Sequence, residues 1–573
     1  MQIIRVDVQS QSIKIEEISK NSKYFLLGAR GLTSQIVYDE VLPTCNPLGS
    51  ENKLILANGI LTGSPFPNSG RTSVGAKSPL TNGVKEANVG GRPSILLARY
   101  GYRAIILEGI SSDSKYILID ENGVSFLSAE KYRGLGNYKL HSELQEIYGR
   151  KIGIYSIGPA GESLMKSATV AANDLEGYPS RHAARGGLGA VMGSKGVKAI
   201  VIVPPRFSKV KMRDLKKFRE ISKPFAQNLA ETKKAFSTFG TAMMMAPMSN
   251  YGGIPTKNFR LGSYDKIDTI TGEKLHEIVV ERGGKKQVAC SPTCVIKCSN
   301  IVVDREGNHV TSSLEYETMA LNGPNLMIDD LDSLAKIDHL CDDLGIDTIE
   351  FGGTVGVAMD CGEVNWGNDK EVFEILDSEI RNNTKKGKLF GNGVKHIGET
   401  LKAKRIPQIK GQGFSAYDPR VFKGMGVTYA TSPMGADHTA GAAIAGRVAN
   451  LKKDYGELTE NRGKFDLSKE LQIYTAVLDS MGCCYFIGPS YEIMEIVTGA
   501  INAMYGLNLK RDDVIHIGKS IIRTEIEFNK RAGIKSEMND VPAFFREEES
   551  VPTGLKYSFP KEDLARFWDE LNQ

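Results

Sequence analysis

The sequence predicts an α+β protein in which a β-rich N-terminal domain is followed by mainly helical segments. Short apolar runs separated by Gly, Asn and Ser fill the first part of the chain, for example residues 53–57, 116–119 and 199–203, and such runs are typical of strands. Farther along, longer segments such as 331–344 and 467–481 carry apolar residues at helical spacing. We therefore expect strands first and helices afterwards.

The chain length predicts more than one domain, because 573 residues exceed what a single hydrophobic core usually serves. The sequence pattern changes from strand-like to helix-like at Val203-Pro204-Pro205, and a less distinct domain boundary lies at Gly411-Gln412-Gly413. We expect a β-rich domain over residues 1–205 and two mainly helical domains over residues 206–413 and 414–573.

The charge pattern argues against nucleic acid as a partner. The 72 basic and 68 acidic residues are spread along the chain and leave a net charge of +4, without the basic stripe that nucleic acid requires. The first residues alternate like a strand, with no export signal, and no 18-residue apolar run follows. We expect a cytoplasmic protein without a membrane span.

Two pairs of similar segments indicate internal repeats. In the β-rich part, Asn88-Val89-Gly90-Gly91 and Arg185-Gly186-Gly187-Leu188 each precede an apolar run that starts at a glycine. In the helical part, Asp342-x-x-Gly345 parallels Asp479-x-x-Gly482. An Asp-x-x-Gly segment commonly ends a helix with a C-cap glycine, but duplication at two places also suggests a ligand with two similar halves. Both interpretations stay open.

The cysteines are clustered in a way that suggests metal. Cys290, Cys294 and Cys298 fall within nine residues, and Cys483 and Cys484 are adjacent. Three close thiolates and a remote fourth are typical of an iron–sulfur cluster. On a continuous helix, Cys290 and Cys298 would lie about 12 Å apart, too far for one small cluster. Pro292 favours an irregular loop instead.

Other interpretations of these cysteines are weaker. Buried free cysteines can pack as small apolar residues. Structural zinc is disfavoured because the chain has no Cys-x-x-Cys pair. A radical-SAM site needs a two-residue gap between its second and third cysteines, and here that gap is three residues.

Several strings together resemble the aldehyde:ferredoxin oxidoreductase family of tungsten and molybdenum bispterin enzymes. They are residues 181–195 (RHAARGGLGAVMGSK), residues 71–80 (RTSVGAKSPL), the paired Asp-x-x-Gly segments, and residues 429–433 followed by His438. The strings occur in the family's order between about residues 25 and 490, so the resemblance covers most of the chain.

The resemblance implies a fold and a set of cofactors. The β-rich domain would form a cofactor base, and the two mainly helical domains would close over it. The cofactors implied are a tungsten- or molybdenum-bispterin (a metallopterin) held by pterin dithiolenes, a 4Fe-4S cluster, and Mg²⁺ bridging the pterin phosphates through the backbone carbonyls of Asn88 and His182. By position, the cofactor-binding residues are Arg71, Asn88, Gly90, Arg181, His182, Ala184, Arg185, Asp342, Ile346, Asp347, Asp479 and Cys483.

The resemblance also implies the ligands of the cluster. Aligning the two Asp-x-x-Gly segments places Cys484 level with Asp347 and Cys483 level with Ile346. Cys484 is then the fourth cluster ligand and Cys483 a contact on the pterin side. The complete predicted ligand set is Cys290, Cys294, Cys298 and Cys484.

Glu317 and His438 stand where the family places side chains at the metal, and we predict them as catalytic residues. Aldehyde oxidation must remove a proton from water or a hydrate and stabilise charge on the carbonyl oxygen, which suits a buried carboxylate and an imidazole. The alternative is that Glu317 caps or pairs within a helix and His438 is an ordinary core histidine.

Three positions depart from the family pattern. The first cysteine gap, from Cys290 to Cys294, is one residue longer, so the loop must bulge. Met434 replaces an arginine expected to contact the cofactor. The Glu-x-x-His motif for a subunit-bridging iron is missing from residues 334–339, and we expect no such iron.

The resemblance implies oxidation of an aldehyde to a carboxylic acid, with electrons passing through the cluster to ferredoxin or an iron–sulfur partner subunit. One alternative is reduction of an aromatic acyl thioester. Another is a cluster-only electron-relay subunit, against which both Asp-x-x-Gly segments argue. The choice between tungsten and molybdenum, and the existence of a homo-oligomer, stay open.

Overall fold

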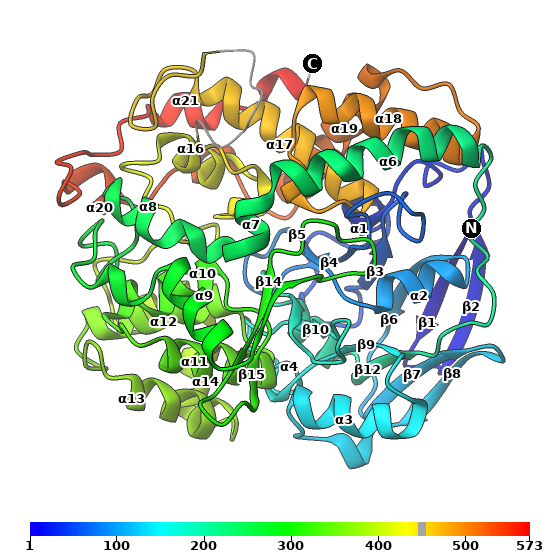
Figure 1. Ribbon diagram of the computed structural model, residues 1–573, viewed down its shortest axis with the longest axis horizontal. Helices are drawn as coiled ribbons and strands as arrows, with labels where there is room; N and C mark the ends of the chain where they lie inside the picture. Colours follow the sequence, from blue (N-terminus) through cyan, green and yellow to red (C-terminus); the bar gives the residue numbers. More distant parts are fainter. Residues whose placement is uncertain (445–453, 573) are drawn as a thin grey trace.

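Two six-stranded sheets from the first 205 residues lie on one side of the molecule, and helices from the rest of the chain cover them (Figure 1). The computed structural model describes residues 1–444 and 454–572. The expected α+β fold class, with a β-rich N-terminal part and mainly helical segments after it, is confirmed.

The first sheet has the strand order β2-β1-β6-β3-β4-β5. Strand β1 pairs in parallel with β6, and every other neighbouring pair is antiparallel. All five residues of β3 are buried, which explains why the first four, Leu54 to Ala57, are apolar without alternation. The elements are β1 (Gln2–Asp7), β2 (Ser12–Glu17), α1 (Ala29–Glu40), β3 (Leu54–Asn58), β4 (Thr72–Lys77), β5 (Val84–Val89), α2 (Pro93–Arg99) and β6 (Tyr102–Glu108).

The second sheet repeats the first, with the order β8-β7-β12-β9-β10-β11. Adding six to each strand number of the first sheet reproduces this order, and the parallel pair, β7 with β12, recurs at the same place. The predicted internal repeat is therefore confirmed. The elements are β7 (Lys115–Asp120), β8 (Gly123–Ser128), α3 (Asn137–Tyr148), β9 (Gly153–Ser156), α4 (Pro159–Glu162), β10 (Val170–Ala172), β11 (Arg181–Ala183), α5 (Leu188–Ser194) and β12 (Val197–Ile202).

The middle of the chain is mainly helical but contains a small sheet that the sequence did not predict. Strands β13 (Lys285–Val288), β14 (Ser299–Val303) and β15 (His309–Thr311) form it, with the cysteine loop between the first two. The helices are α6 (Leu215–Thr232), α7 (Lys234–Phe239), α8 (Met245–Asn250), α9 (Gly272–Glu281), α10 (Tyr316–Asn322), α11 (Leu331–Leu344), α12 (Thr348–Asp360), α13 (Asp369–Glu374), α14 (Lys385–Gly391) and α15 (Gly393–Thr400).

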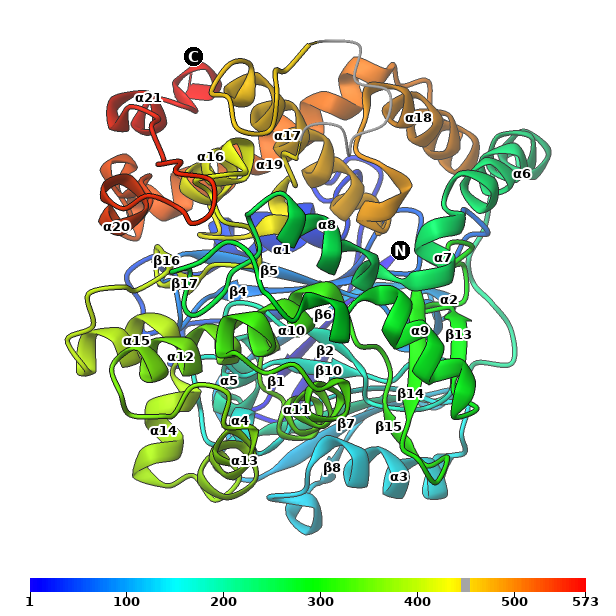
Figure 2. The same ribbon diagram turned by 60° about the vertical axis from the view of Figure 1, so that its left-hand side comes forward.

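The last part of the chain packs its helices onto the first sheet. Helices α17 and α19 contact α1, as Figure 2 also shows. Within residues 1–444 and 454–572, the helices are too short or too polar to cross a membrane. The elements are β16 (Gln408–Ile409), β17 (Gln412–Gly413), α16 (Lys423–Thr431), α17 (Lys464–Met481), α18 (Tyr491–Tyr505), α19 (Arg511–Arg531), α20 (Ala543–Glu547) and α21 (Lys561–Ala565).

The two Asp-x-x-Gly segments end helices α11 and α17, one above each sheet. Gly345 and Gly482 are left-handed C-caps, with φ of 71° and 76°, so the C-cap interpretation is confirmed. A Cβ on Gly59 would lie 2.0 Å from the nitrogen of Gly482, and one on Gly158 would lie 2.3 Å from the oxygen of Leu344. Glycine thus allows each helix end to touch the sheet domain backbone to backbone.

Candidate functional site

The structure brings together the four cysteines predicted as cluster ligands. Cys290, Cys294 and Cys298 lie on the irregular loop between β13 and β14, and Cys484 follows the end of α17. The thiols of Cys290 and Cys294 are close enough to shift each other's pKa, and those of Cys298 and Cys484 interact electrostatically with Cys290. The expectation of a loop instead of a helix is confirmed.

Asn68 joins the cysteine loop to the end of α17. Its backbone oxygen accepts a hydrogen bond from the nitrogen of Cys484 at 2.8 Å. Its side-chain amide donates to Cys294 Sγ at 3.7 Å, and its Oδ1 accepts from the nitrogen of Val295 at 3.2 Å. No local sequence pattern indicates this role of Asn68, because its contacts are with residues more than 200 positions away.

Two half-buried arginines, Arg71 and Arg181, make the environment of these cysteines electropositive. The pKa of Cys290 is lowered to about 5 by the hydrogen bond with Cys294 and by the cations of Arg71 and Arg181, which together outweigh burial. Burial raises the pKa of Cys298 well above its ordinary value. A thiolate is the form of cysteine that ligates metal, and nearby cations favour it.

These cysteines do not form a site for a single ion. Among residues 1–444 and 454–572, no three His, Cys, Asp or Glu side chains are arranged as ligands of one metal ion. A 4Fe-4S cluster has one thiolate at each of its four irons, so its ligands stand farther apart than those of one ion. Ligation of a cluster by the four cysteines stays a prediction.

Beside the cysteines, buried donors lack partners where the resemblance places the pterin phosphates. In the described part of the chain, the amide nitrogen of Asn88 and the Nε and NH2 atoms of Arg181 are buried without a hydrogen-bond partner. Arg71 donates to Asn88, to its side-chain oxygen and, at 3.2 Å, to its backbone oxygen. Buried donors normally have acceptors, so these residues fit a bound polyanion.

The guanidinium of Arg185 is hydrogen-bonded to protein groups, and its contact with the cofactor stays a prediction. It donates to the backbone oxygens of Ala436 at 2.7 Å and Gly413 at 2.5 Å. Its Nε lies 3.4 Å from the carboxylate of Asp347, and its NH2 lies 3.5 Å from that of Glu350. Arg185, which follows Ala184 at the end of β11, therefore ties the second sheet to the helical segments.

The first Asp-x-x-Gly segment is attached to strands β10 and β11. His182 Nε2 lies 3.0 Å from Asp342 Oδ1, and His182 Nδ1 is hydrogen-bonded to Thr169 Oγ1 at 2.7 Å. Ile346 forms an antiparallel bridge with Ala168. Asp347 caps α12 by accepting from the nitrogen of Ile349 at 3.0 Å.

The second segment places a carboxyl group among other buried charges. Asp479 Oδ2 lies 3.3 Å from Arg30 NH1. Burial, with a contribution from Glu86, raises the pKa of Asp479 to about 8 despite the nearby arginines. Such a carboxyl group can donate a hydrogen bond when it is protonated and accept one when it is ionised. The neighbouring thiol of Cys483 is buried, which raises its pKa.

Glu317 and His438 lie side by side. Glu317 is in the first turn of α10, and His438 follows the loop after α16. His438 Nε2 is 3.5 Å from Glu317 Oε1, while Glu317 Oε2 accepts a hydrogen bond from the nitrogen of Ala416 at 2.7 Å. His438 Nδ1 is buried and has no hydrogen-bond partner among the described residues. The imidazole thus has one nitrogen left for a ligand.

A buried ion pair that the sequence analysis missed holds the loop before His438. Lys85 Nζ lies 2.6 Å from Asp437 Oδ2, with side chains 1% and 5% exposed. The same ammonium lies 3.7 Å from the sulfur of Met434. Asp437 Oδ1 accepts from the nitrogen of Thr439 at 3.0 Å. The signal was present in the sequence, because Lys85 and Glu86 are two adjacent charged residues in a short strand.

Gly90 and Gly186, one in each copy of the repeat in the β-rich part, lie close against protein side chains. A Cβ on Gly90 would lie 3.4 Å from Cys290 Sγ, and one on Gly186 would lie 2.3 Å from Lys85 Cγ. The nitrogen of Gly91 also donates to the oxygen of Cys290 at 2.8 Å. These glycines therefore make room for protein side chains.

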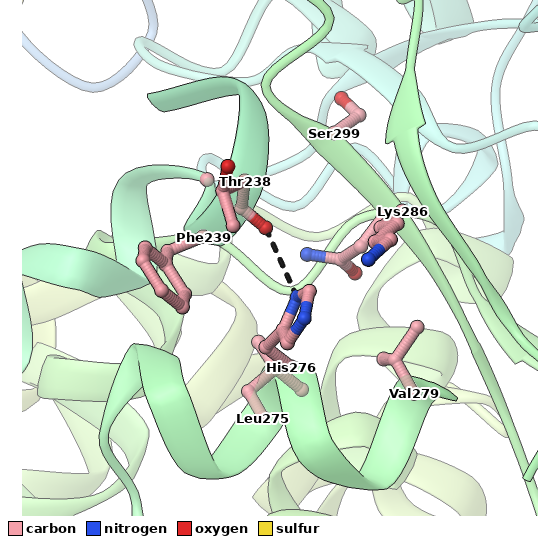
Figure 3. A pocket seen from close by; sticks show the side chains of 9 residues that line it. Thr238, Phe239, Leu275, His276, Val279, Lys286 and Ser299 are labelled. Atoms are coloured by element: carbon pink, nitrogen blue, oxygen red, sulfur yellow. Dashed lines mark hydrogen bonds between the residues drawn. The ribbon is translucent and has the colours of Figure 1, made fainter. Parts of the chain in front are cut away.

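A small hollow behind the cysteine loop has no part in this site. It lies between α7, α9 and β14, where His276 Nδ1 donates to the oxygen of Thr238 at 3.2 Å (Figure 3). Its volume of about 10 Å³ leaves room for about one water molecule.

Comparisons with known proteins assign the class of protein. Residues 3–204 match the family model of the aldehyde ferredoxin oxidoreductase N-terminal domain, and residues 218–570 match that of its domains 2 and 3. The chain therefore belongs to the aldehyde ferredoxin oxidoreductase family, as the sequence analysis predicted, and it is an oxidoreductase.

Individual relatives agree with this assignment. The chain is 32% identical to the tungsten-containing aldehyde ferredoxin oxidoreductase of Pyrococcus furiosus, over 99% of this chain and 96% of the relative. It is 27% identical to the WOR-like subunit of an aliphatic sulfonate oxidoreductase from the same organism, over 91% and 85% of the two chains. The active-site complex BamBC of benzoyl coenzyme A reductase has a similar fold, with a TM-score of 0.82 at 19% identity, over 100% of this chain and 94% of that one.

Proposed function

We propose that this protein oxidises an aldehyde to a carboxylic acid and passes the electrons through a 4Fe-4S cluster to ferredoxin or an iron–sulfur partner subunit. The observation that carries the proposal is the pairing of Glu317 with His438, at 3.5 Å, in a chain 32% identical to a tungsten-containing aldehyde ferredoxin oxidoreductase over nearly its full length. The cofactor proposed is a tungsten- or molybdenum-bispterin with Mg²⁺ on its phosphates.

The buried groups without partners support this cofactor. Asn88, Arg181 and Arg71 would hold the pterin phosphates. The cations of Arg71 and Arg181 also favour the thiolate form of Cys290 at the cluster. Asp342 and Asp479 would contact the two pterins, and the protonated form of Asp479 suits a ring nitrogen that accepts a hydrogen bond. When bound, the metal supplies the acceptor for the two electrons of the reaction.

The protein's own residues handle the protons of this reaction. The balanced change is aldehyde plus water to carboxylic acid, two protons and two electrons. Glu317, held by the nitrogen of Ala416, accepts a proton from the attacking water as general base. The free Nδ1 of His438 hydrogen-bonds the carbonyl oxygen of the substrate, and its Nε2 faces Glu317. The pair can thus share the proton as it leaves.

Reduction of an aromatic acyl thioester is the second candidate. The fold likeness to an active-site complex of benzoyl coenzyme A reductase favours it. The sequence identity to that complex is 19%, whereas the identity to the aldehyde ferredoxin oxidoreductase is 32%. Proteins that share a fold often act on different substrates. We therefore rank it below aldehyde oxidation.

The test is metal analysis and turnover of anaerobically purified protein. We expect about one tungsten or molybdenum and about four irons per chain, with reduction of an artificial electron acceptor that depends on added aldehyde. Iron without tungsten or molybdenum would support the cluster-only relay subunit and contradict the proposal. Full metal with turnover of benzoyl-CoA but of no aldehyde would favour the second candidate.

A further inference from the structure

A pocket of about 420 Å³ has neither the cluster cysteines nor Glu317 and His438 in its lining. Its walls come from two segments, residues 395–411 and residues 538–544. Figure 2 shows these segments where β16 and β17 lie between α15 and α20. The volume falls in the range of pockets that hold small molecules.

The lining combines apolar walls with lysines. Ile409, Val541 and Phe544 are buried side chains of the wall. Lys395 and Lys404 are exposed at the pocket, and Lys410 is buried. This pattern suits a small anion with an apolar body.

The single carboxylate of the lining does not cancel these lysines. Asp540 already has two cations of its own. Its Oδ1 accepts from Arg546 Nε at 2.9 Å, and its Oδ2 lies 3.0 Å from Lys561 Nζ. Lys395 Nζ lies 3.9 Å from Glu399 Oε1, but both side chains are exposed and solvent screens the pair. The lysines of the pocket therefore keep an excess positive charge.

Lys410 connects this pocket to the loop that carries His438. Its ammonium donates to the backbone oxygens of Ser432 at 2.7 Å and Ala430 at 3.1 Å, at the end of α16. Burial lowers the pKa of Lys410 to about 7, and an anion nearby would favour its charged form. Trp568 donates to the oxygen of Thr431, between these two, at 2.8 Å.

We propose that this pocket binds a small carboxylate with an apolar body, and that Lys410 transmits its occupancy to the loop of His438. The choice of a carboxylate rests on the proposed function, since that is the class of product the reaction releases. The pocket would then let the product regulate the enzyme from outside the catalytic site.

Titration of the purified full-length protein with hexanoate tests the proposal. Calorimetry should show saturable binding in the millimolar range, and the neutral analogue hexanamide should bind at least about tenfold more weakly. In a Trp366→Phe background, where Trp568 is the only tryptophan, emission should change with the same saturation curve. Neither measurement needs turnover, so an inactive protein would contradict the proposed function without touching this result.

Charge reversal locates the bound hexanoate. The double variant Lys395→Glu/Lys404→Glu should weaken binding about tenfold or more. Lys402→Glu is the matched control, an exposed lysine on the same segment that does not line the pocket, and it should bind like the parent protein. Unchanged binding in the double variant, or inhibition purely competitive with aldehyde, would place the anion elsewhere and overturn the proposal. Binding that leaves Trp568 emission unchanged would overturn the link through Lys410.

Discussion

At the scale of single residues, the clearest feature is a cation that comes from an unexpected place. Met434 stands where the family pattern has an arginine, yet a positive charge is still present there, because Lys85 reaches across from strand β5. That ammonium neutralises Asp437, whose pKa it lowers, together with Arg185 and His438, against the effect of burial. The loop before His438 is thus fixed by a residue of the first sheet.

Replacing this lysine should destabilise the protein. Lys85→Met leaves the carboxylate of Asp437 buried with its closest cation gone, which costs on the order of 3–5 kcal/mol. We expect a lower melting temperature and slower aldehyde turnover. The double variant Lys85→Met/Asp437→Asn removes the unpaired charge and should recover much of the loss. A melting temperature equal to that of the parent in the single variant would contradict this role.

The predicted catalytic pair can be tested separately from folding. Glu317→Gln removes the proposed base and should lower turnover by roughly 10²–10⁴. His438→Asn removes the proposed hydrogen bond to the substrate oxygen and should also slow turnover. Both variants should retain their full content of metal and iron, which elemental analysis checks. Near-normal activity in both would show that the pair has another role.

The adjacent cysteines should respond differently to substitution. Cys484→Ser removes a predicted cluster ligand, and we expect lost iron or an altered electron paramagnetic resonance spectrum. Cys483→Ser changes a thiol that is buried near Asp479, and the iron content should stay at about four per chain. The reverse pattern would show that the alignment of the two Asp-x-x-Gly segments is shifted by one residue.

At the scale of elements, the turn between β5 and α2 positions the cysteine loop. A Cβ on Gly90 would lie 3.3 Å from the backbone oxygen of Cys290, so alanine would be tight but tolerable, whereas a larger side chain would displace the loop. Gly90→Val should therefore lose iron, while Gly90→Ala should keep most of it. Iron analysis and the visible absorbance of the cluster measure the difference, and full iron in Gly90→Val would contradict the assigned packing.

At the scale of the whole molecule, a buried ion pair fastens the C-terminal helices to the first sheet. Arg30 on α1 donates to both oxygens of Glu525 on α19, at 2.9 and 2.8 Å, and Ser34 donates to the same carboxylate at 2.8 Å. The side chains of Arg30 and Glu525 are 2% and 0% exposed. Such a pair specifies how the two layers meet.

Breaking this pair should be costly and insensitive to salt. Arg30→Met leaves Glu525 buried without its strongest partner, at a cost of about 3–5 kcal/mol. The drop in melting temperature should be the same at low and high sodium chloride, because a buried pair is screened little. Arg30→Met/Glu525→Leu should melt closer to the parent protein. A drop that disappears in high salt would show that the pair is solvated.

The sequence by itself determined the features that depend on local patterns. Apolar runs between turns identified the strands, and Pro292 predicted the irregular cysteine loop. The paired glycine segments indicated an internal repeat, which the equivalent strand orders of the two sheets confirm. Helix α11 begins and ends where its spacing indicated, at residues 331 and 344. These features could be predicted because periodicity and turn chemistry act between residues close in the chain.

Only the tertiary structure decided which distant groups meet. Arg185 donates to the backbone oxygens of Ala436 and Gly413, more than 200 positions away. Lys85 and Asp437, 352 positions apart, form a pair that no local pattern contains. Burial also sets the pKa of Asp479 near 8. Desolvation and ion pairing depend on the groups that surround a side chain in space. The sequence therefore shows which residues are charged, whereas their partners and their burial follow only from the fold.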